Sequence, residues 1–582
     1  MLEATKSIGS ADTNLNEDSG NNSRETWIGG LSLTSSIERL SKTCEIYVNK
    51  DDCLKSESSF FRNLIKDYGI RFLVLSSLTS HFLKGFCRAQ SQFSARFLLQ
   101  STNISGPRLD TFVSMIDIPW SMKPLVSILS DSWPVFGYKK TPYMIMTLAI
   151  GLIGILLVVV SNDTSDIVRI ELSIAGMFLA NFAWMTTDIL SEGLFARRMT
   201  VHPSSAPDFT VFLSIGQQFS FVVSCIISGY MLEHATGVMA LSGAQWNMLI
   251  CLIPTAVTMY PVLRNYGGES RISREDAKRH RWNMWTEQRP IVFSSILFGV
   301  TSLTFASCAP VLSAQGGFFL CLALVFAMNF VIWMLFNPCI SKLVMFLTIT
   351  SLTNMSLSGP AHYFYTDGWA QFPAGPHFEP WFFVTVCGVV GAVVTIAALS
   401  IYTVYFKTAK YKPIFFILCT CNALLSAPNS VLFSRLNIDW GISDYWFVAS
   451  DTALQTAVAG LLFVPGFLLL SRVCPDQLES SMFAMMAATA NFAQTANGLI
   501  SAFICDSMDI TPDGSPDETE KFTNMWIANL IMAALKLAPL IFLWLLPDAR
   551  MTDNMDSVRA NVLSESPWRR FLNARSVKPV DV

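Results

Sequence analysis

The stretch PIVFSSILFGVTSLTFASCAPVLSAQGGFFLCLALVFAMNFVIWMLFNPCIS, residues 290–341, contains no Asp, Glu, Lys, Arg or His. A helix rises about 1.5 Å per residue, so roughly 20 apolar residues cross a bilayer hydrocarbon core about 30 Å thick. This stretch is long enough for two crossings. Uncharged runs of spanning length recur at 209–232, 381–406, 452–471 and 481–505. The sequence therefore predicts an all-α protein that crosses a membrane many times.

The composition agrees with this prediction. Hydrophobic residues make up 52% of the chain and charged residues 14%, whereas soluble domains are about 25% charged. The 13 cysteines form no CxxC pair and no cluster at zinc spacing, so no metal or cofactor is expected. Apolar runs predict fourteen spans, at 69–89, 106–129, 142–160, 168–190, 209–232, 246–264, 290–311, 315–336, 341–359, 381–406, 413–434, 449–471, 480–505 and 523–546.

Basic residues indicate the orientation of these spans, because Lys and Arg concentrate in cytoplasmic loops. With the N-terminus inside, the inner loops carry most of the loop Lys and Arg, including the run at 264–289. An even number of spans then places the C-terminus in the cytosol as well. We expect an integral membrane protein of the plasma membrane, with no nucleic-acid partner.

The basic loop also divides the spans into six before it and eight after it. If the pair within 290–338 is an insertion, six spans remain on each side. The expected organisation is a disordered cytosolic N-tail at 1–65, a six-helix half at 66–264, a basic cytosolic loop at 265–289, an extra helix pair at 290–338, a second six-helix half at 339–548 and a cytosolic C-tail at 549–582.

Two short segments at equivalent places in the two halves resemble each other. GYKKTPYMI at 137–145 and AKYKPIFFI at 409–417 each precede the third span of their half, and each pairs Tyr and Lys with a proline suited to a first helical turn. The pattern is typical of major-facilitator transporters, whose binding site lies between two parallel halves near the middle of the membrane.

The segment DIPWSMKPLVSILSDSWPVFGYKKTPY, residues 117–143, resembles the signature of the folate-biopterin transporter family. DILSEG at 188–193 is similar to that family's fourth-span motif, and CPDQLESSMFAMMAATANF at 474–492 is similar to its protist members. The chain departs from the family pattern at Ser127, where glycine is usual, and at Lys139 and Lys140, where arginines are usual. Ser is still small enough for close helix packing, and Lys keeps the charge but loses the bidentate fork of Arg.

The resemblance implies a secondary active transporter of folate and pteridines such as biopterin, working by alternating access within a major-facilitator-like fold. Its partners would be the small-molecule substrate, the lipid bilayer and, for coupling, protons. Another small metabolite such as S-adenosylmethionine remains an alternative cargo. A membrane-embedded enzyme is less well supported, because the chain contains no HExxH, GxSxG or P-loop motif.

Charged residues inside predicted spans are the candidate site, because a charge at the centre of a membrane helix costs roughly 2.5–3.5 kcal/mol on insertion scales. Asp188 and Glu192 lie four residues apart, on one face of the fourth span. Lys84 lies in the first span, and Asp117 and Lys123 lie in the second. These residues could bind substrate or handle protons. The alternative is that a carboxylate pairs with Lys84 only to hold two helices together.

The chemistry of the substrate class suggests roles for these groups. A pterin ring presents an amide N–H beside an exocyclic amine, and one carboxylate, Asp188 or Glu192, could accept both. The glutamate tail of folate needs a cation, which Lys84 or Arg435 could supply.

A second group of charges lies at the predicted cytoplasmic mouth. Asp131, Lys139 and Lys140 could form a gate that latches one conformation and releases another, as alternating access requires. The alternative is an ordinary positively charged inner loop. Lys536, in the last span, is interpreted as a snorkelling or helix-pairing residue.

Overall fold

The computed structural model describes residues 60–161, 166–202, 205–406, 408–473, 479–551 and 566–568. The predicted N-tail before residue 60 and most of the predicted C-tail lie outside these ranges, and residues 60–68 are helical. The chain divides into two units, and every described helix of spanning length lies in the second, Leu64–Val582. Among the described residues, β pairing is confined to two isolated bridges, Val135 with Tyr138 and Lys410 with Arg550.

Within the described ranges, twelve helices are long and apolar enough to cross a membrane. Two further continuous helical stretches, Ile70–Gln100 and Glu479–Ser507, are of similar length and coincide with the other two predicted spans. The expectation of an all-α, many-span protein is confirmed.

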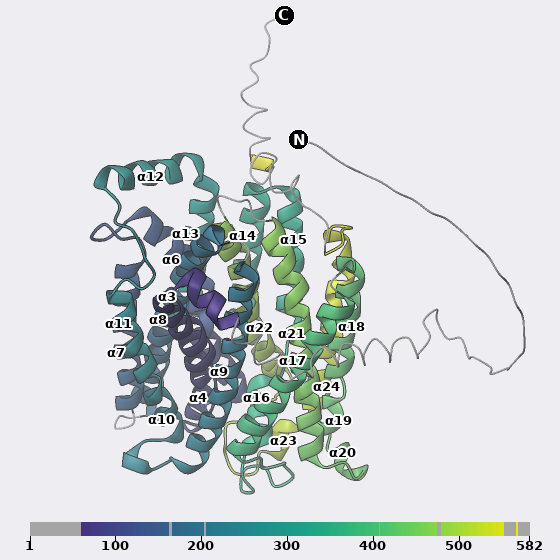
Figure 1. Ribbon diagram of the computed structural model, residues 1–582. Coiled ribbons are helices and arrows are strands. Elements are labelled where there is room, and N and C mark those ends of the chain that lie inside the picture. The colour runs from purple at the N-terminus through teal and green to yellow at the C-terminus, as the bar shows by residue number, and fades with distance from the viewer. Residues whose placement is uncertain are drawn as a thin grey trace, which may run out of the picture. The chain divides into compact units, whose positions relative to one another are not determined.

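Six helical stretches lie in the predicted first half, which is drawn in purple to blue-teal in Figure 1. These are α3–η1–α4 (Ile70–Ser76, Ser77–Cys87, Arg88–Gln100), α5–η2–α6 (Gly106–Asp117, Ile118–Met122, Lys123–Ser132), α7 (Thr141–Val160), α8 (Asp166–Val201), α9 (Ala206–His234) and α10–α11 (Gly243–Ile250, Leu252–Leu263).

The remaining helices lie in the predicted extra pair and the predicted second half. After α12 (Arg274–Glu287), the pair is α13 (Arg289–Cys308) and α14 (Ala314–Leu335). The last six spans are α15–α16 (Pro338–Thr353, Ser358–Thr366), η5–α17 (Trp381–Val386, Cys387–Tyr405), α18–α19 (Tyr411–Ser426, Asn429–Phe433), α21 (Asp444–Val473), α22 (Glu479–Ser507) and α23–α24–η6 (Thr519–Phe522, Met525–Leu535, Ala538–Leu545). The short α20 (Leu436–Asp439) lies between α19 and α21.

Figure 1 shows α12 at one end of the bundle and α10, α20 and α23 at the other. We call the end with α12 the inner end and the opposite end the outer end, because α12 carries the basic loop that the charge bias predicts to be cytosolic.

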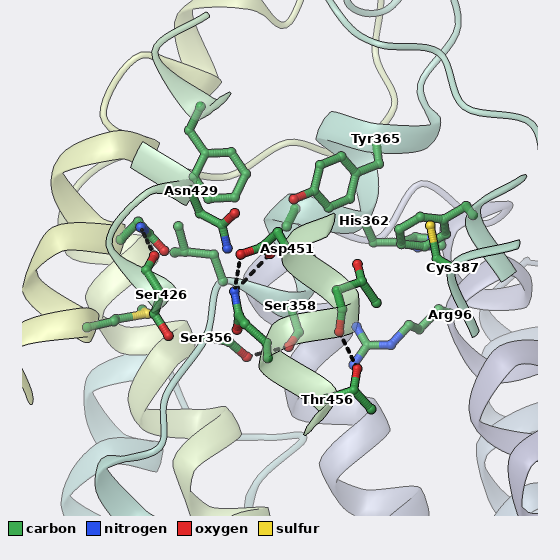
Figure 2. Close-up of a pocket in the computed structure, with 18 of the residues that line it drawn as sticks. Arg96, Ser356, Ser358, His362, Tyr365, Cys387, Ser426, Asn429, Asp451 and Thr456 are labelled. Atoms are coloured by element: carbon green, nitrogen blue, oxygen red, sulfur yellow. Dashed lines mark hydrogen bonds between the residues drawn. The ribbon is translucent and has the colours of Figure 1, made fainter. Parts of the chain in front are cut away.

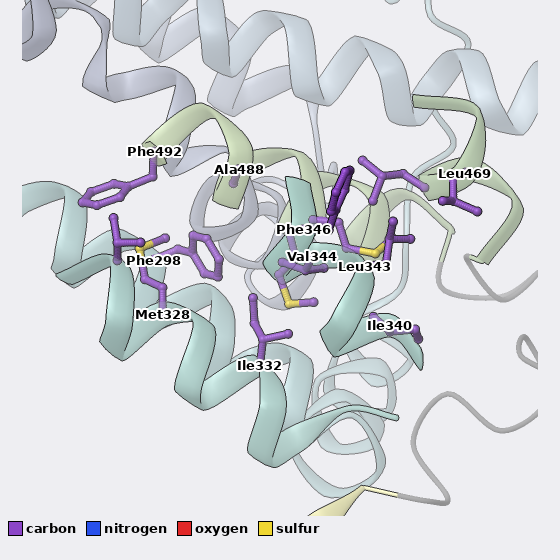
Figure 3. Close-up of a cluster of buried hydrophobic side chains, with 14 of the residues drawn as sticks. Phe298, Met328, Ile332, Ile340, Leu343, Val344, Phe346, Leu469, Ala488 and Phe492 are labelled. Carbon is purple, nitrogen blue, oxygen red and sulfur yellow. The ribbon is translucent and has the colours of Figure 1, made fainter. Parts of the chain in front are cut away.

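The two halves meet along two seams. On one seam α9 packs against η5 and α17, and on the other α5 packs against α22 and α16. The extra pair covers the second seam, because α13 packs on η2 and α6 while α14 packs on α22 and α15. Buried side chains from α13, α14, α15 and α22, among them Phe298, Met328, Phe346 and Phe492, form one apolar cluster there (Figure 3).

Close backbone approach joins α7 to α8. A Cβ atom added at Gly154 would lie 2.5 Å from the carbonyl oxygen of Gly176, and one added at Gly176 would lie equally close to that of Gly154. Small residues allow this spacing, which maximises packing between helices that gain little hydrophobic energy from association in lipid.

Among the interrupted spans, the second and the ninth are each broken near the middle at a proline. Pro119 and Pro124 lie in and next to the 3₁₀ turn of η2. In the ninth span, residues 354–357 are not helical and α16 begins at Ser358, two residues before Pro360. A proline ring clashes with the carbonyl four residues earlier, so Pro360 is accommodated only in the first turn of a new helix.

Candidate functional site

Four of the predicted site residues form one charge cluster. Asp188 Oδ2 lies 2.6 Å from Lys123 Nζ, and Asp188 Oδ1 lies 3.1 Å from Lys84 Nζ. Glu192 Oε1 lies 2.9 Å from Lys84 Nζ and 3.7 Å from Lys123 Nζ. The cluster joins the first, second and fourth spans.

Local structure places these side chains. The spacing of Asp188 and Glu192 puts both on one face of α8, as predicted. Lys123 is the first residue of α6, directly after the 3₁₀ turn, and Lys84 lies in the π-helical stretch η1. Wide π turns inside helices are often found at functional sites.

Exposure divides the cluster into hidden and accessible parts. The side chain of Asp188 is 1% exposed, whereas those of Lys84 and Glu192 are 22% and 34% exposed. Each Asp188 oxygen already faces one lysine. Asp188 therefore positions the two lysines, and Lys84 and Glu192 are the members that a solute can reach.

The accessible members line a cavity of about 480 Å³ between the two halves, which we call the inner cavity. Its charged lining residues are Lys84, Arg88, Lys123, Glu192 and Lys536. The second half contributes polar and apolar groups, among them Asn354, Phe415, Asn422, Asn491 and Gln494. The lining is thus rich in cations.

An aromatic ring lies among these cations. The Arg88 guanidinium lies 4.1 Å from the centre of the Trp120 ring, and Lys123 Nζ lies 5.3 Å from it. The Trp120 indole N–H donates to Asn181 Oδ1 at 3.2 Å, which fixes the plane of the ring. Such cation–π contacts hold the charges in place without neutralising them.

A second cavity of about 430 Å³ lies nearer the outer end, and we call it the outer cavity (Figure 2). Its charged lining residues are Arg96, Asp451 and Lys536. Lys536 lines both cavities, so the two meet at this side chain.

The other two predicted site residues line neither cavity. Asp117 Oδ2 accepts a 3.4 Å hydrogen bond from Gln92. Arg435 forms a bidentate pair with Asp444, with both nitrogen–oxygen distances 2.9 Å, at the outer end. Arg435 thus clamps a loop in the structure and does not meet the charge cluster.

The predicted gate residues surround the start of α7. Glu269 accepts hydrogen bonds from the backbone N–H groups of Lys139 at 2.6 Å, Lys140 at 2.9 Å and Thr141 at 3.0 Å. A carboxylate at this position satisfies the free N–H groups of a helix N-terminus. Asp131 makes no ion pair within 4 Å among the described residues; burial lowers the pKa of Lys139, and the charge of Asp131 opposes that shift.

Sequence reasoning missed several of these residues. Glu269 was one of four acids in the basic loop, 128 residues from Thr141, and nothing local distinguished it from the others. Lys536 did carry a signal, a charge within an apolar span, but was interpreted as a helix-pairing residue. Within the described ranges, no group of three or more His, Cys, Asp and Glu is placed to hold a metal ion.

Comparison with known proteins assigns the family. Residues 83–565 match the model of the BT1 family. The chain belongs to the BT1 family. The match covers most of the chain, including the charge cluster and both cavities.

Relatives of this BT1 protein bear transporter names. It is 23% identical over 438 residues to the probable folate-biopterin transporter 2 of Arabidopsis thaliana, covering 74% of this chain and 73% of that protein. It is 21% identical to the folate-biopterin transporter of Synechocystis, covering 81% of each. It is 20% identical to folate transporter 1 of Plasmodium falciparum, covering 77% of this chain and 74% of that protein. These names agree with the expected carrier and not with an enzyme.

Solved structures show the same fold. The nucleoside transporter NupG superposes with a TM-score of 0.52 at 12% identity, covering 82% of this chain and 99% of that one. A POT family transporter in complex with a thioalcohol-conjugated peptide gives a TM-score of 0.54 at 13% identity, covering 81% and 96%. The BT1 protein therefore has a major-facilitator-like fold, as the internal repeat predicted.

Proposed function

We propose that this BT1 protein is a secondary active transporter of folate and related pteridines, which it moves by alternating access. The observation that carries the proposal is the excess of cations that line the inner cavity of this protein, which is related to folate-biopterin transporters. The names of the Arabidopsis, Synechocystis and Plasmodium relatives support the substrate class.

The charge balance of the inner cavity favours an anion. Lys84, Lys123, Asp188 and Glu192 neutralise one another. Arg88 adds a positive charge, and its buried Nε has no hydrogen-bond partner among the described residues. A carboxylate entering the cavity would supply that partner, and charge-assisted hydrogen bonds of this kind are the strong ones.

The same balance distinguishes between the candidate cargoes. Folate carries a dicarboxylate tail, which cations attract. S-adenosylmethionine carries a sulfonium cation, which Arg88 and Lys536 would repel. The lining therefore favours folate over S-adenosylmethionine.

Polar contacts between the halves at the outer end support alternating access. Gln100 Nε2 donates to Thr366 at 2.9 Å, and Asp110 Oδ2 accepts from the N–H of Gly359 at 2.8 Å. The Tyr363 hydroxyl donates to the carbonyl of Ile104. These contacts would have to break before the outer cavity could open outward.

The direct test is uptake by purified protein in liposomes. Labelled folate or biopterin should accumulate chemically unaltered, and unlabelled pterins and folates should compete with it. Competition by S-adenosylmethionine alone would establish the alternative cargo, and a chemically changed product would contradict a carrier. Repeating the assay with an imposed pH gradient, with and without a protonophore, tests the proposed proton coupling.

A substitution tests the role of the cations. Arg88→Gln should weaken folate binding about 10–100-fold, because a hydrogen bond to a charged group contributes about 1.5–3 kcal/mol. The matched control is Arg108→Gln, since Arg108 is exposed and lines neither cavity. Equal folate affinity in both variants would remove Arg88 from the site.

Location and orientation complete the proposal. We propose that both termini lie in the cytosol, on the basis of the loop charges alone. The plasma membrane is the proposed location, and the loop charges do not bear on it. Protease accessibility of terminal tags in intact and permeabilised cells tests this orientation.

A further inference from the structure

The outer cavity contains a carboxylate that forms no ion pair with the described residues. Asp451, on α21, has no Lys or Arg nitrogen within 4 Å among the described residues, unlike Asp188. Both Asp451 oxygens lie 2.8 Å from one nitrogen, Nε2 of Gln455. The side-chain amide of Asn429 is a second hydrogen-bond partner of Asp451. A carboxylate has about four acceptor positions, so these two amides leave Asp451 with capacity to spare.

Unpartnered polar atoms surround this carboxylate. Both ring nitrogens of His362 and Oδ1 of Asn429 are buried without a hydrogen-bond partner among the described residues. Figure 2 shows Asn429 beside Asp451, with Tyr365 on the adjoining wall. Buried polar atoms are normally satisfied, so a cluster of unsatisfied ones in a cavity indicates a place for a polar ligand.

The walls of the outer cavity are aromatic and come from both halves. The first half contributes Phe93, Phe97 and Phe221, and the second contributes Tyr365, Phe383 and Phe433. The rings of Tyr365 and Phe383 lie 5.4 Å apart. A flat heterocycle can stack on such rings while its polar edge faces the carboxylate.

Asp188 and Glu192 are poorer candidates than Asp451 for binding a pterin ring. Asp188 is buried and already faces two lysines, and Glu192 lies 2.9 Å from Lys84. A pterin that bonded to both oxygens of either carboxylate would compete with a lysine already in place. At Asp451 it would compete only with the neutral amides of Gln455 and Asn429.

Lys536 connects the two cavities. Its Nζ donates to Ser426 Oγ at 2.5 Å within the outer cavity, and the same side chain also lines the inner cavity. A molecule with a flat ring at one end and carboxylates at the other could therefore occupy both cavities at once, passing Lys536.

We infer that Asp451 in the outer cavity binds the pterin ring, accepting from its ring N–H and its exocyclic amine, while the cations of the inner cavity bind the anionic tail of folate. The inference rests on the proposed function and assigns the two ends of its substrate. It makes Asp451 a specificity-determining residue for the ring, and Arg88 one for the tail.

The test compares two tail-free ligands on purified protein. 6-Methylpterin presents two donors, ring N–H and amine, whereas 6-methyllumazine has an oxygen in place of the amine. The wild-type protein should bind the pterin at least tenfold more tightly than the lumazine. Asp451→Asn replaces one acceptor by a donor, so this preference should fall at least tenfold.

Two further variants separate the ends of the substrate. Arg88→Gln should weaken folate binding but leave 6-methylpterin binding within about twofold. Asp451→Glu keeps the charge, so it should retain the preference for pterin over lumazine even if affinity falls; it serves as the fallback if Asp451→Asn is unstable. Asp439→Asn, at an exposed outer-end position, is the matched control.

The outcomes are distinguishable. If the wild-type protein binds neither folate nor 6-methylpterin, the proposed function fails and the inference falls with it. If it binds both, but Asp451→Asn keeps the wild-type preference for pterin, or loses folate while retaining 6-methylpterin, only the inference is overturned.

Discussion

Neutralising Lys123 and Asp188 together should cost less stability than the two single changes added. Their 2.6 Å contact is buried, with Lys123 8% exposed and Asp188 1% exposed. Asp188→Asn leaves Lys123 with only Glu192, at 3.7 Å, and upsets a balance of two cations and two anions. Breaking a buried pair by removing one partner costs about 3–5 kcal/mol.

The double variant, Lys123→Gln with Asp188→Asn, restores that balance. The 2.9 Å pair of Lys84 with Glu192 remains, one cation with one anion. The loss of stability in the double variant should therefore be about 2–3 kcal/mol smaller than the sum of the losses in the two single variants. This value lies in the upper part of the range of interaction energies for contacting residues.

The assay is thermal unfolding of the purified protein, with folate uptake measured in parallel. At about 2 °C per kcal/mol, each single variant should melt roughly 6–10 °C below the wild type. Uptake should be lost in both single variants and should not return in the double variant, since Lys123 is still missing from the cavity.

An exposed ion pair provides the matched control. Lys410 and Asp548 lie 3.2 Å apart with side chains 49% and 64% exposed, and neutralising them should change stability by less than about 1 kcal/mol. If the buried single variants are no worse than this pair, or if their effects simply add, the cluster is not coupled as argued.

Three other predictions concern parts of the fold away from the cavities. Glu269→Gln should lower stability by about 1–3 kcal/mol and make loop 133–140 more sensitive to protease, because a charged acceptor for the first N–H groups of α7 is lost. Gly154→Val should sharply reduce the amount of folded protein, since even a Cβ would lie 2.5 Å from the Gly176 carbonyl oxygen. Burial, and secondarily the charge of Glu518, raise the pKa of Asp367 to about 7. Between about pH 4 and 7 this carboxyl therefore binds more protons in the folded protein than in the unfolded protein. Its contribution to stability falls as pH rises through that window. Melting temperatures between pH 5 and 8 should therefore fall more steeply with pH in the wild type than in Asp367→Asn.

Each of these has its own control. Glu275, in the first turn of α12, is exposed, and Glu275→Gln should leave the loop at wild-type sensitivity. Ile153→Val, at a position 56% exposed on the same helix as Gly154, should express normally. If the melting temperatures of the wild type and Asp367→Asn fall equally with pH, a group other than Asp367 causes the pH dependence of stability.

Most of the helical architecture could be predicted from the sequence. A bilayer needs about 20 apolar residues per crossing, and that requirement is visible in any window of the chain. The spacing of Asp188 and Glu192 was equally local, and the fold class and family were both confirmed.

What the sequence could not predict depends on which helices meet. Both oxygens of Asp188 face lysines only because three spans pack together. The sequence near Asp188 therefore gave no reason to reject the hypothesis that this carboxylate binds the pterin. Asp451 lay two residues inside a predicted span boundary and resembled an interfacial residue. The cap that Glu269 places on α7 likewise joins segments with no shared pattern.

The extra helices α13 and α14 make the two seams between the halves unequal. Protein covers the seam of α5 with α22, whereas α9, on the opposite seam, presents Ile215 and Phe219 with 64% and 69% of their surfaces exposed. Lipid pressure and acyl-chain composition thus act directly on the seam of α9. On the seam of α5 with α22 they act only through the apolar hairpin of α13 and α14. A rocking motion between the halves would then respond to the surrounding lipid asymmetrically, with the hairpin serving as a built-in substitute for annular lipid along its seam.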